Sequence, residues 1–194
     1  MEDLTTLRKT GSYLQGHPDM KHIPGVDMSS GSLGQGISAA VGMAIAAKLS
    51  GDSYRVYTLL GDGEIQEGQV WEAAMLAAHR KLDNLVVIVD NNNLQIDGAI
   101  DDVNSPYPID KKFEAFNFHV INIDGHDFDA IAAAFKEARE TKGQPTAIIA
   151  KTVKGKGVSF MENQASWHGA APNDEQYEVA MADLEKVGEA LCQK

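Results

Sequence analysis

The sequence predicts an α/β fold: a doubly wound, mainly parallel sheet with helices on both faces. Apolar runs at 54–60, 85–90, 118–123 and 146–151 have the length of buried strands, and helical patterns alternate with them. Strands that alternate with helices favour a parallel sheet with right-handed crossovers. With 194 residues, 43% of them hydrophobic, the chain is long enough for one good core, so we expect a single domain over residues 1–194.

The first half of the chain is predicted to hold two helices. Glycines and prolines make the opening, through about Pro24, irregular. Helices are expected over 34–49 and 66–82, on either side of the first strand, and both carry unusually small residues along one stripe. Such stripes suit close packing, either against another subunit or within the domain, and the sequence leaves both possibilities open.

The second half is expected to begin with an irregular acidic stretch over 91–112. Asp127 is a suitable N-cap for a helix over 128–141, whose apolar residues recur at helical spacing. A long loop over 153–173 follows the last strand, and helical spacing predicts a final helix over 174–191.

Composition narrows the class of protein. The chain has 28 acidic against 17 basic residues, which argues against a nucleic-acid binder. Its one cysteine, Cys192, excludes an internal disulfide and fits a reducing compartment. Neither an 18-residue apolar run nor a signal peptide is evident, so we expect a cytoplasmic protein without a membrane partner.

Polar motifs follow the first two strands directly. Gly61-Asp62-Gly63-Glu64 comes after the first, and Asn91-Asn92 comes after the second. Parallel strands deliver their carboxyl ends to one edge of the sheet, where open α/β proteins bind ligands. Oxygen ligands of this kind suit Mg²⁺ or Ca²⁺, and Mg²⁺ usually arrives with phosphates. The motifs therefore predict a metal–diphosphate site; the alternative is a plain strand-to-helix turn followed by a loop.

Together these two motifs resemble the GDG…NN signature of thiamine diphosphate enzymes. The resemblance implies that thiamine diphosphate binds here with Mg²⁺ or Ca²⁺. Asp62, Asn92 and the carbonyl of Leu94 stand at the family's metal-ligand positions. Gly63, at the start of the following helix, would let backbone N–H groups approach the diphosphate.

Further motifs narrow the resemblance to transketolases. Gly31-Ser32-Leu33-Gly34-Gln35-Gly36 is similar to that family's GxLGQG segment, and Gly16-His17-Pro18-Asp19 looks like its GHPE loop, with Asp19 in place of Glu. Trp167-His168-Gly169 looks like its HG turn. The match runs from about Leu4 onward and looks most like the N-terminal subunit of split prokaryotic transketolases. The family's first helices, its pyrimidine-binding domain and its C-terminal domain are expected to be absent.

The resemblance also implies roles for single residues. Gly31 and Leu33 would contact the cofactor, while His17 and His168 would line the substrate channel and assist proton transfer. Glu67 matches a glutamate between the two active sites of the dimer, although a first-turn helix carboxylate explains it equally well. The remaining histidines receive no role: His22, His79, His119 and His126.

The implied activity is thiamine diphosphate-dependent transfer of a two-carbon ketol unit between ketose and aldose phosphates, as in the pentose phosphate pathway. The implied partners are a C-terminal transketolase subunit carrying the pyrimidine-binding domain, a second copy of the chain, and sugar phosphates. We expect the chain to be inactive by itself. The alternatives are a non-catalytic cofactor-binding or dimerisation subunit, and a fragment of a 2-oxo-acid dehydrogenase α chain or a deoxyxylulose phosphate synthase.

Other phosphate and metal motifs fit less well. The segment Gly34–Ala39 matches G-x-G-x-x-A, but the residues before it are too short and broken for the leading strand of a dinucleotide fold. A P-loop fails because Gly157 follows Lys156 where Ser or Thr is required. A Ca²⁺ loop of EF-hand type fails because Leu94 takes a ligand position.

Overall fold

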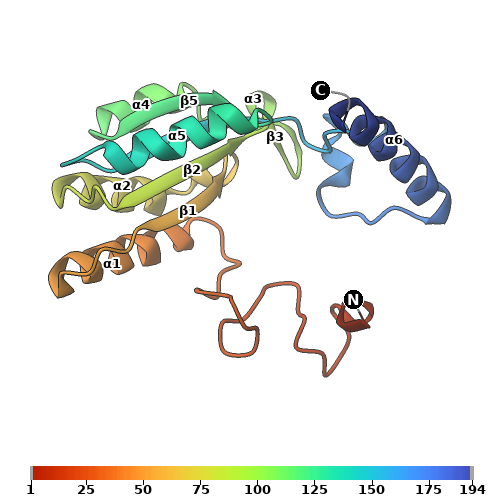
Figure 1. Cartoon of the computed structure of the whole chain (residues 1–194), viewed down its shortest axis with the longest axis horizontal. Coiled ribbons are helices and arrows are strands. Elements are labelled where there is room, and N and C mark those ends of the chain that lie inside the picture. The colour runs from red at the N-terminus through yellow and green to blue at the C-terminus, as the bar shows by residue number, and fades with distance from the viewer. Residues whose placement is uncertain (1, 193–194) are drawn as a thin grey trace.

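The computed structural model describes residues 2–192, with a four-stranded parallel sheet at its centre (Figure 1). The strands lie in the order β1 (Val56–Gly61), β2 (Leu85–Asn91), β6 (Thr146–Lys151) and β5 (His119–Asp124). Every neighbouring pair is parallel. The predicted α/β class is confirmed, and all four predicted strands are present, their boundaries shifted by at most two residues.

Helices cover both faces of this sheet, as predicted. The first face packs against α1 (Gln35–Ser50), α2 (Gly68–His79) and α4 (Ile109–Ala115), and the second packs against α5 (Phe128–Glu140). Alternate residues of β2 supply the two cores: Val87 belongs to the first and Val86 to the second. A strand buried on both faces has to be apolar throughout, which explains the unbroken apolar run at 85–89.

The small residues of α1 and α2 form a seam within the domain. Ala40 and Ala44 on α1 are buried in the same core as Ala73, Ala74 and Ala77 on α2, and the two helices contact each other. Small side chains let the two helices approach closely while both lie on the sheet. Packing inside the domain therefore accounts for these buried stripes.

Two expectations about local structure were wrong. The stretch 91–112 is not irregular: it holds the hairpin strands β3 (Leu94–Gln95) and β4 (Gly98–Ala99), the short helix α3 (Ile100–Val103) and the start of α4. These elements are too short to show a period in the sequence. The helix expected over 66–82 is shorter, because η2 (Glu64–Gln66) is a separate 3-10 turn and Glu67 is extended between it and α2.

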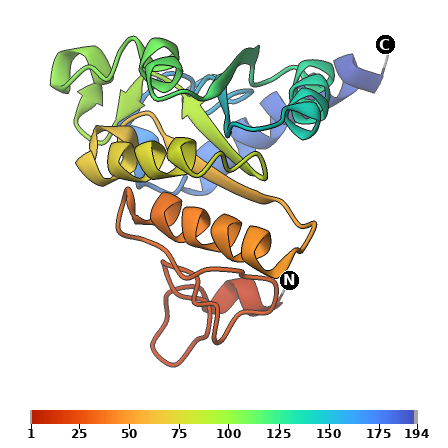
Figure 2. The same ribbon diagram turned by 90° about the vertical axis from the view of Figure 1, so that its left-hand side faces the viewer.

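The two ends of the chain extend away from the sheet. Helix η1 (Glu2–Thr6) and the loop that follows it lie below α1 in Figure 2, whereas α6 (Asp174–Cys192) forms a separate arm in Figure 1. Only Ala180 of α6 is buried, and Asp183 ties the helix to the preceding loop by accepting the backbone and side-chain hydrogen bonds of Ser159. Among residues 2–192, no helix is long and apolar enough to cross a membrane.

Candidate functional site

The carboxyl ends of all four strands meet at one edge of the sheet. In the strand register, Gly61 lies opposite Asp90 and Asn91 lies opposite Lys151. Backbone hydrogen bonds extend this alignment past the strands, because the Asp62 N–H donates to the Asp90 carbonyl at 3.2 Å. The residues that follow each strand are therefore neighbours, as the strand-end motifs predicted.

The three predicted metal ligands lie together at this edge. One carboxylate oxygen of Asp62, Oδ2, accepts the Asn93 N–H at 2.6 Å. The side-chain oxygen of Asn92 accepts the Leu94 N–H at 3.0 Å, and its amide nitrogen donates to Asp90 Oδ2 at 3.1 Å. These contacts hold Asp62, Asn92 and Leu94 in adjoining turns at the same edge of the sheet.

The electrostatics of this group favour a cation. Asp62 is only 1% exposed, and it has no Lys, Arg or His ion-pair partner among the described residues. Burial raises the pKa of its carboxyl, and the nearby Asp90 carboxylate raises it further, whereas the N–H groups of Asn93 and Gly63 oppose the rise. A bound cation would relieve the cost of this buried charge.

The available donor atoms suit Mg²⁺ or Ca²⁺. They are carboxylate, amide and carbonyl oxygens, which hard cations prefer. Within residues 2–192, no group of three or more His, Cys, Asp or Glu side chains is placed to hold a metal. The residues present thus fit the metal implied by the resemblance.

Gly63 is placed differently from the expectation. It precedes the 3-10 turn η2, so it lies five residues before α2 and does not begin that helix. Its N–H donates to Asp62 Oδ1 at 2.9 Å. A Cβ at this position would lie 3.1 Å from Cβ of Gln95, so the close approach of the β3 hairpin favours glycine here.

His17 and Gly31 form a second group, at the start of α1. The imidazole of His17 lies against Gly31 so closely that a Cβ there would be 2.5 Å from its Cδ2 atom. Asp19 closes the loop between them, because its carboxylate accepts the hydroxyl of Ser29 at 3.0 Å and contacts Nδ1 of His22 at 2.8 Å. The structure thus brings His17 to the predicted cofactor segment.

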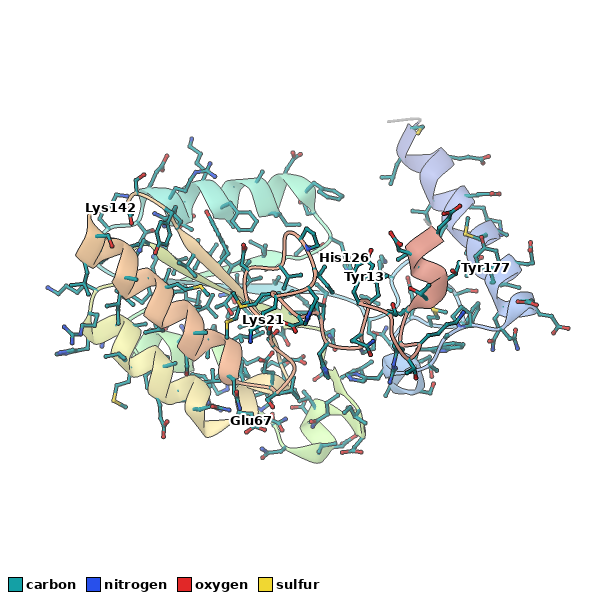
Figure 3. All side chains as sticks on the ribbon, turned by 90° about the horizontal axis from the view of Figure 1, so that it is seen from below. Tyr13, Lys21, Glu67, His126, Lys142 and Tyr177 are labelled. Carbon is teal, nitrogen blue, oxygen red and sulfur yellow. The ribbon has the colours of Figure 1, made fainter. Side chains whose placement is uncertain are left out.

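The remaining predicted residues flank these two groups. Leu33 is 56% exposed, as a residue that supports a ligand must be. Glu67 lies where α1 and α2 begin (Figure 3); it occupies the N-cap position of α2, yet its side chain forms no capping hydrogen bond. His168 lies on η3 (Ala165–His168), which contacts β3 next to Leu94. Within residues 2–192, no hydrogen bond joins His17 to His168. Both roles of Glu67 stay open.

Sequence reasoning missed the contribution of the fourth strand end. The Thr152 hydroxyl donates to the Asp90 carboxylate, which in turn holds Asn92. His126 also acts here, because its Nε2 atom accepts the Val153 N–H at 2.8 Å and so anchors the loop after β6. Lys154 lines a cavity with Asp90 and Asn92. The rule that exposed the first two motifs, polar residues directly after a strand, would have found Thr152.

Comparisons with known proteins agree with this geometry. A family model described as the thiamine diphosphate binding domain of transketolase matches residues 1–186. The chain is 45% identical over 188 residues to a 6-deoxy-6-sulfo-D-fructose transketolase subunit of Clostridium sp. (strain MSTE9), covering 97% of this chain and 68% of that one. It is 43% identical to an apulose-4-phosphate transketolase subunit of Actinobacillus succinogenes, covering 93% and 65%.

Solved structures show the same likeness. The transketolase of Campylobacter jejuni superposes with a TM-score of 0.88 at 37% identity, over 93% of this chain and 29% of that one. The Pichia stipitis enzyme in complex with sedoheptulose-7-phosphate gives 0.85 at 30% identity, over 97% and 32%. The chain therefore spans about two thirds of the subunit relatives and under a third of these transketolases.

Proposed function

The chain belongs to the transketolase family, as its thiamine diphosphate-binding domain, and from this premise we propose that it is the N-terminal subunit of a transketolase assembled from separate chains. In this proposal a second subunit carries the pyrimidine-binding domain, and two copies of the assembly associate. The reaction is transfer of a two-carbon ketol unit between sugar phosphates, in the manner of the pentose phosphate pathway. The observation that carries the proposal is the group of Asp62, Asn92 and Leu94 at one sheet edge.

Each proposed role follows from the chemistry of the side chain. Asp62, Asn92 and the Leu94 carbonyl would hold Mg²⁺ or Ca²⁺, which would anchor the diphosphate next to Gly63. Thiamine diphosphate supplies, when bound, the electron sink that carbon–carbon bond cleavage requires. His17 and His168 would bind hydroxyl groups of the sugar, and an imidazole can accept or donate a proton near neutral pH.

The relatives support a substrate with an anionic end. Their names specify apulose-4-phosphate for one and 6-deoxy-6-sulfo-D-fructose for another, which are sugars with a phosphate or a sulfonate. For this chain we propose only what these two substrates share: a ketose with a negatively charged terminal group. The single cysteine supports a reducing compartment such as the cytoplasm as its place of action.

Calorimetric titration of thiamine diphosphate with Mg²⁺ tests the proposal, first with this chain by itself and then with a C-terminal transketolase subunit present. We expect binding that EDTA abolishes, and ketol transfer only when both subunits are present. Binding without transfer in the two-subunit mixture would favour the alternative of a non-catalytic cofactor-binding subunit. A lack of binding under both conditions would contradict the proposal.

A further inference from the structure

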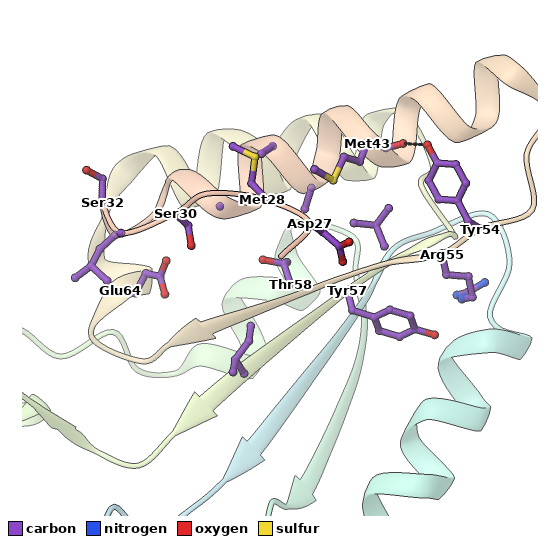
Figure 4. A pocket seen from close by; sticks show the side chains of 17 residues that line it. Asp27, Met28, Ser30, Ser32, Met43, Tyr54, Arg55, Tyr57, Thr58 and Glu64 are labelled. Carbon is purple, nitrogen blue, oxygen red and sulfur yellow. Dashed lines mark hydrogen bonds between the residues drawn. The ribbon is translucent and has the colours of Figure 1, made fainter. Parts of the chain in front are cut away.

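Glu64 lies thirty residues after Gly34 in the sequence, yet its side chain joins the segment of Gly34 to the end of β1. Its carboxylate Oε1 accepts the Gly34 N–H at 2.9 Å, and Oε2 accepts the Gly61 N–H at 3.0 Å. Gly61 immediately precedes Asp62 of the metal group, and Gly34 ends the segment that holds Gly31 and Leu33. Figure 4 shows the Glu64 side chain between the loop before α1 and the end of β1.

Further contacts hold the Leu33–Gly34 part of the first segment against the start of α2. Gln69 donates from its Nε2 atom to the Leu33 carbonyl at 3.2 Å. Gly34 is buried with φ +81°, and a Cβ there would be 2.8 Å from Cβ of Glu67. Gly34 is also the N-cap of α1 and has no side chain with which to accept the N–H groups of the first helical turn. The Glu64 carboxylate accepts the N–H of Gly34 itself and so places a negative charge at the start of the helix, where the helix dipole favours it.

We propose that Glu64 is a positioning residue that fixes the Gly31–Gly34 segment against the Asp62–Gly63 turn. This inference rests on the proposed function, because it assumes that a single cofactor contacts both segments. A carboxylate that accepts two backbone N–H groups forms charge-assisted hydrogen bonds, which are stronger than neutral ones. With both segments fixed before binding, the cofactor does not have to order them, and affinity is gained.

Three variants test whether the effect of Glu64 comes from its two hydrogen bonds or from its negative charge. Glu64→Gln keeps the length of the side chain but leaves only one oxygen for two N–H groups. Glu64→Asp keeps the charge but is one methylene shorter, so it cannot span both segments. Glu72→Gln is the matched control, because Glu72 is an exposed residue of α2 whose side chain makes no hydrogen bond within residues 2–192.

Calorimetric titration of thiamine diphosphate with Mg²⁺ into each variant, with a C-terminal transketolase subunit present, measures the effect. Loss of one charge-assisted hydrogen bond predicts binding about tenfold weaker for both Glu64 variants, and unchanged binding for Glu72→Gln. Parental affinity in either Glu64 variant would overturn the inference. If the variants bind the cofactor as tightly as the parent does, the role of Glu64 is wrong but the proposed function is unaffected. If the parent does not bind the cofactor, the proposed function and the role of Glu64 are both wrong.

Hydrogen exchange gives a readout that does not depend on the cofactor. We expect the backbone N–H groups of Gly34 and Gly61 to exchange at least about tenfold faster in Glu64→Gln than in the parent. The glutamine side chain has a single oxygen, so in either of its two orientations one of these N–H groups has no acceptor. The amide of Val87, in the sheet core, should be unchanged. Faster exchange throughout the sheet would mean general destabilisation and would overturn a positioning role.

Discussion

The two edges of the sheet both carry buried or half-buried aspartates, but they satisfy them differently. At the amino edge, Asp83 precedes β2, and its carboxylate contacts Lys48 Nζ at 2.7 Å and accepts the Gly143 N–H at 2.9 Å. The Asp83 carbonyl accepts a hydrogen bond from the Arg55 guanidinium, which also reaches the Ala138 carbonyl. This edge pairs its negative charge with cations of the chain itself.

At the carboxyl edge, Asp62 and Asp90 lie close together, and the described part of the chain offers no cationic side chain in ion-pair contact with either. Hydrogen bonds from N–H, amide and hydroxyl groups orient these carboxylates without neutralising them. The amino edge, which we call the structural edge, balances its charge within the protein. The carboxyl edge, which we call the binding edge, holds carboxylates whose charge the cation of our proposal would offset.

The largest expected effect comes from Asp62→Asn, with Asp83→Asn as the matched change at the other edge. Loss of a charged metal ligand should weaken Mg²⁺-dependent binding of thiamine diphosphate by about a hundredfold or more. Asp83→Asn should leave that binding unchanged, because its partners all lie at the amino edge. Calorimetric titration, with and without EDTA, measures both.

The stability of Asp62→Asn should change little, in contrast to its large effect on cofactor binding. In the metal-free protein, Asp62→Asn removes a desolvated charge but also costs one hydrogen-bond acceptor, so the unfolding free energy should stay within about 1 kcal/mol of the parent. Urea denaturation measures the unfolding free energy of both proteins.

The binding titration decides the metal assignment. If Asp62→Asn bound the cofactor as well as the parent did, that assignment would be wrong.

A smaller effect is expected from Thr152→Val, which removes the hydroxyl that holds the Asp90 carboxylate. Asp90 orients Asn92, so we expect Mg²⁺-dependent cofactor binding to weaken about tenfold, in the range typical of groups that orient a metal ligand. Thr152→Ser retains the hydroxyl and should restore binding. Equal affinity in Thr152→Val and the parent would show that Asn92 needs no such support.

The binding edge could be predicted from the sequence because its signals are local. Each strand is a short apolar run, and in a parallel sheet every strand end reaches the same edge. Asp62 and Asn92 directly follow such runs, so their proximity followed from the fold class alone. The positions of Gly61 and Asp90 in the strand register confirm it.

Other parts of the site depend on tertiary contacts that leave no periodic trace. Nothing in the spacing of Glu64 and Gly34 shows that a carboxylate joins them, because the contact links the loop before α1 to the turn after β1, with a helix and a strand between them in the sequence. The hairpin and short helices within 91–112 were missed for a related reason: α4 is only seven residues long, and burial of Ile109 and Phe113 against the sheet stabilises it.

The smallest predicted effect concerns the structural edge. It is the pH dependence of the stability that Asp83 contributes. Burial raises the pKa of this carboxyl, but the hydrogen bonds from Gly143 and Lys48 outweigh burial, and the pKa is lowered. A lowered pKa stabilises the folded state above the pKa of the unfolded chain, about 3.9, and this contribution is lost as the pH falls through the folded value. The side chain is 24% exposed, so solvent screening limits the effect.

We therefore expect Asp83→Asn to cost about 1 kcal/mol of unfolding free energy near pH 7, and progressively less below about pH 4. Urea denaturation of both proteins across this pH range, without added metal, measures the difference. The difference between the two unfolding free energies at each pH cancels the contribution of the carboxylates that both proteins share, and leaves the contribution of Asp83. A difference that stayed constant down to about pH 2 would mean that the charge of Asp83 contributes nothing, and the amino edge would then owe its stability to packing and neutral hydrogen bonds.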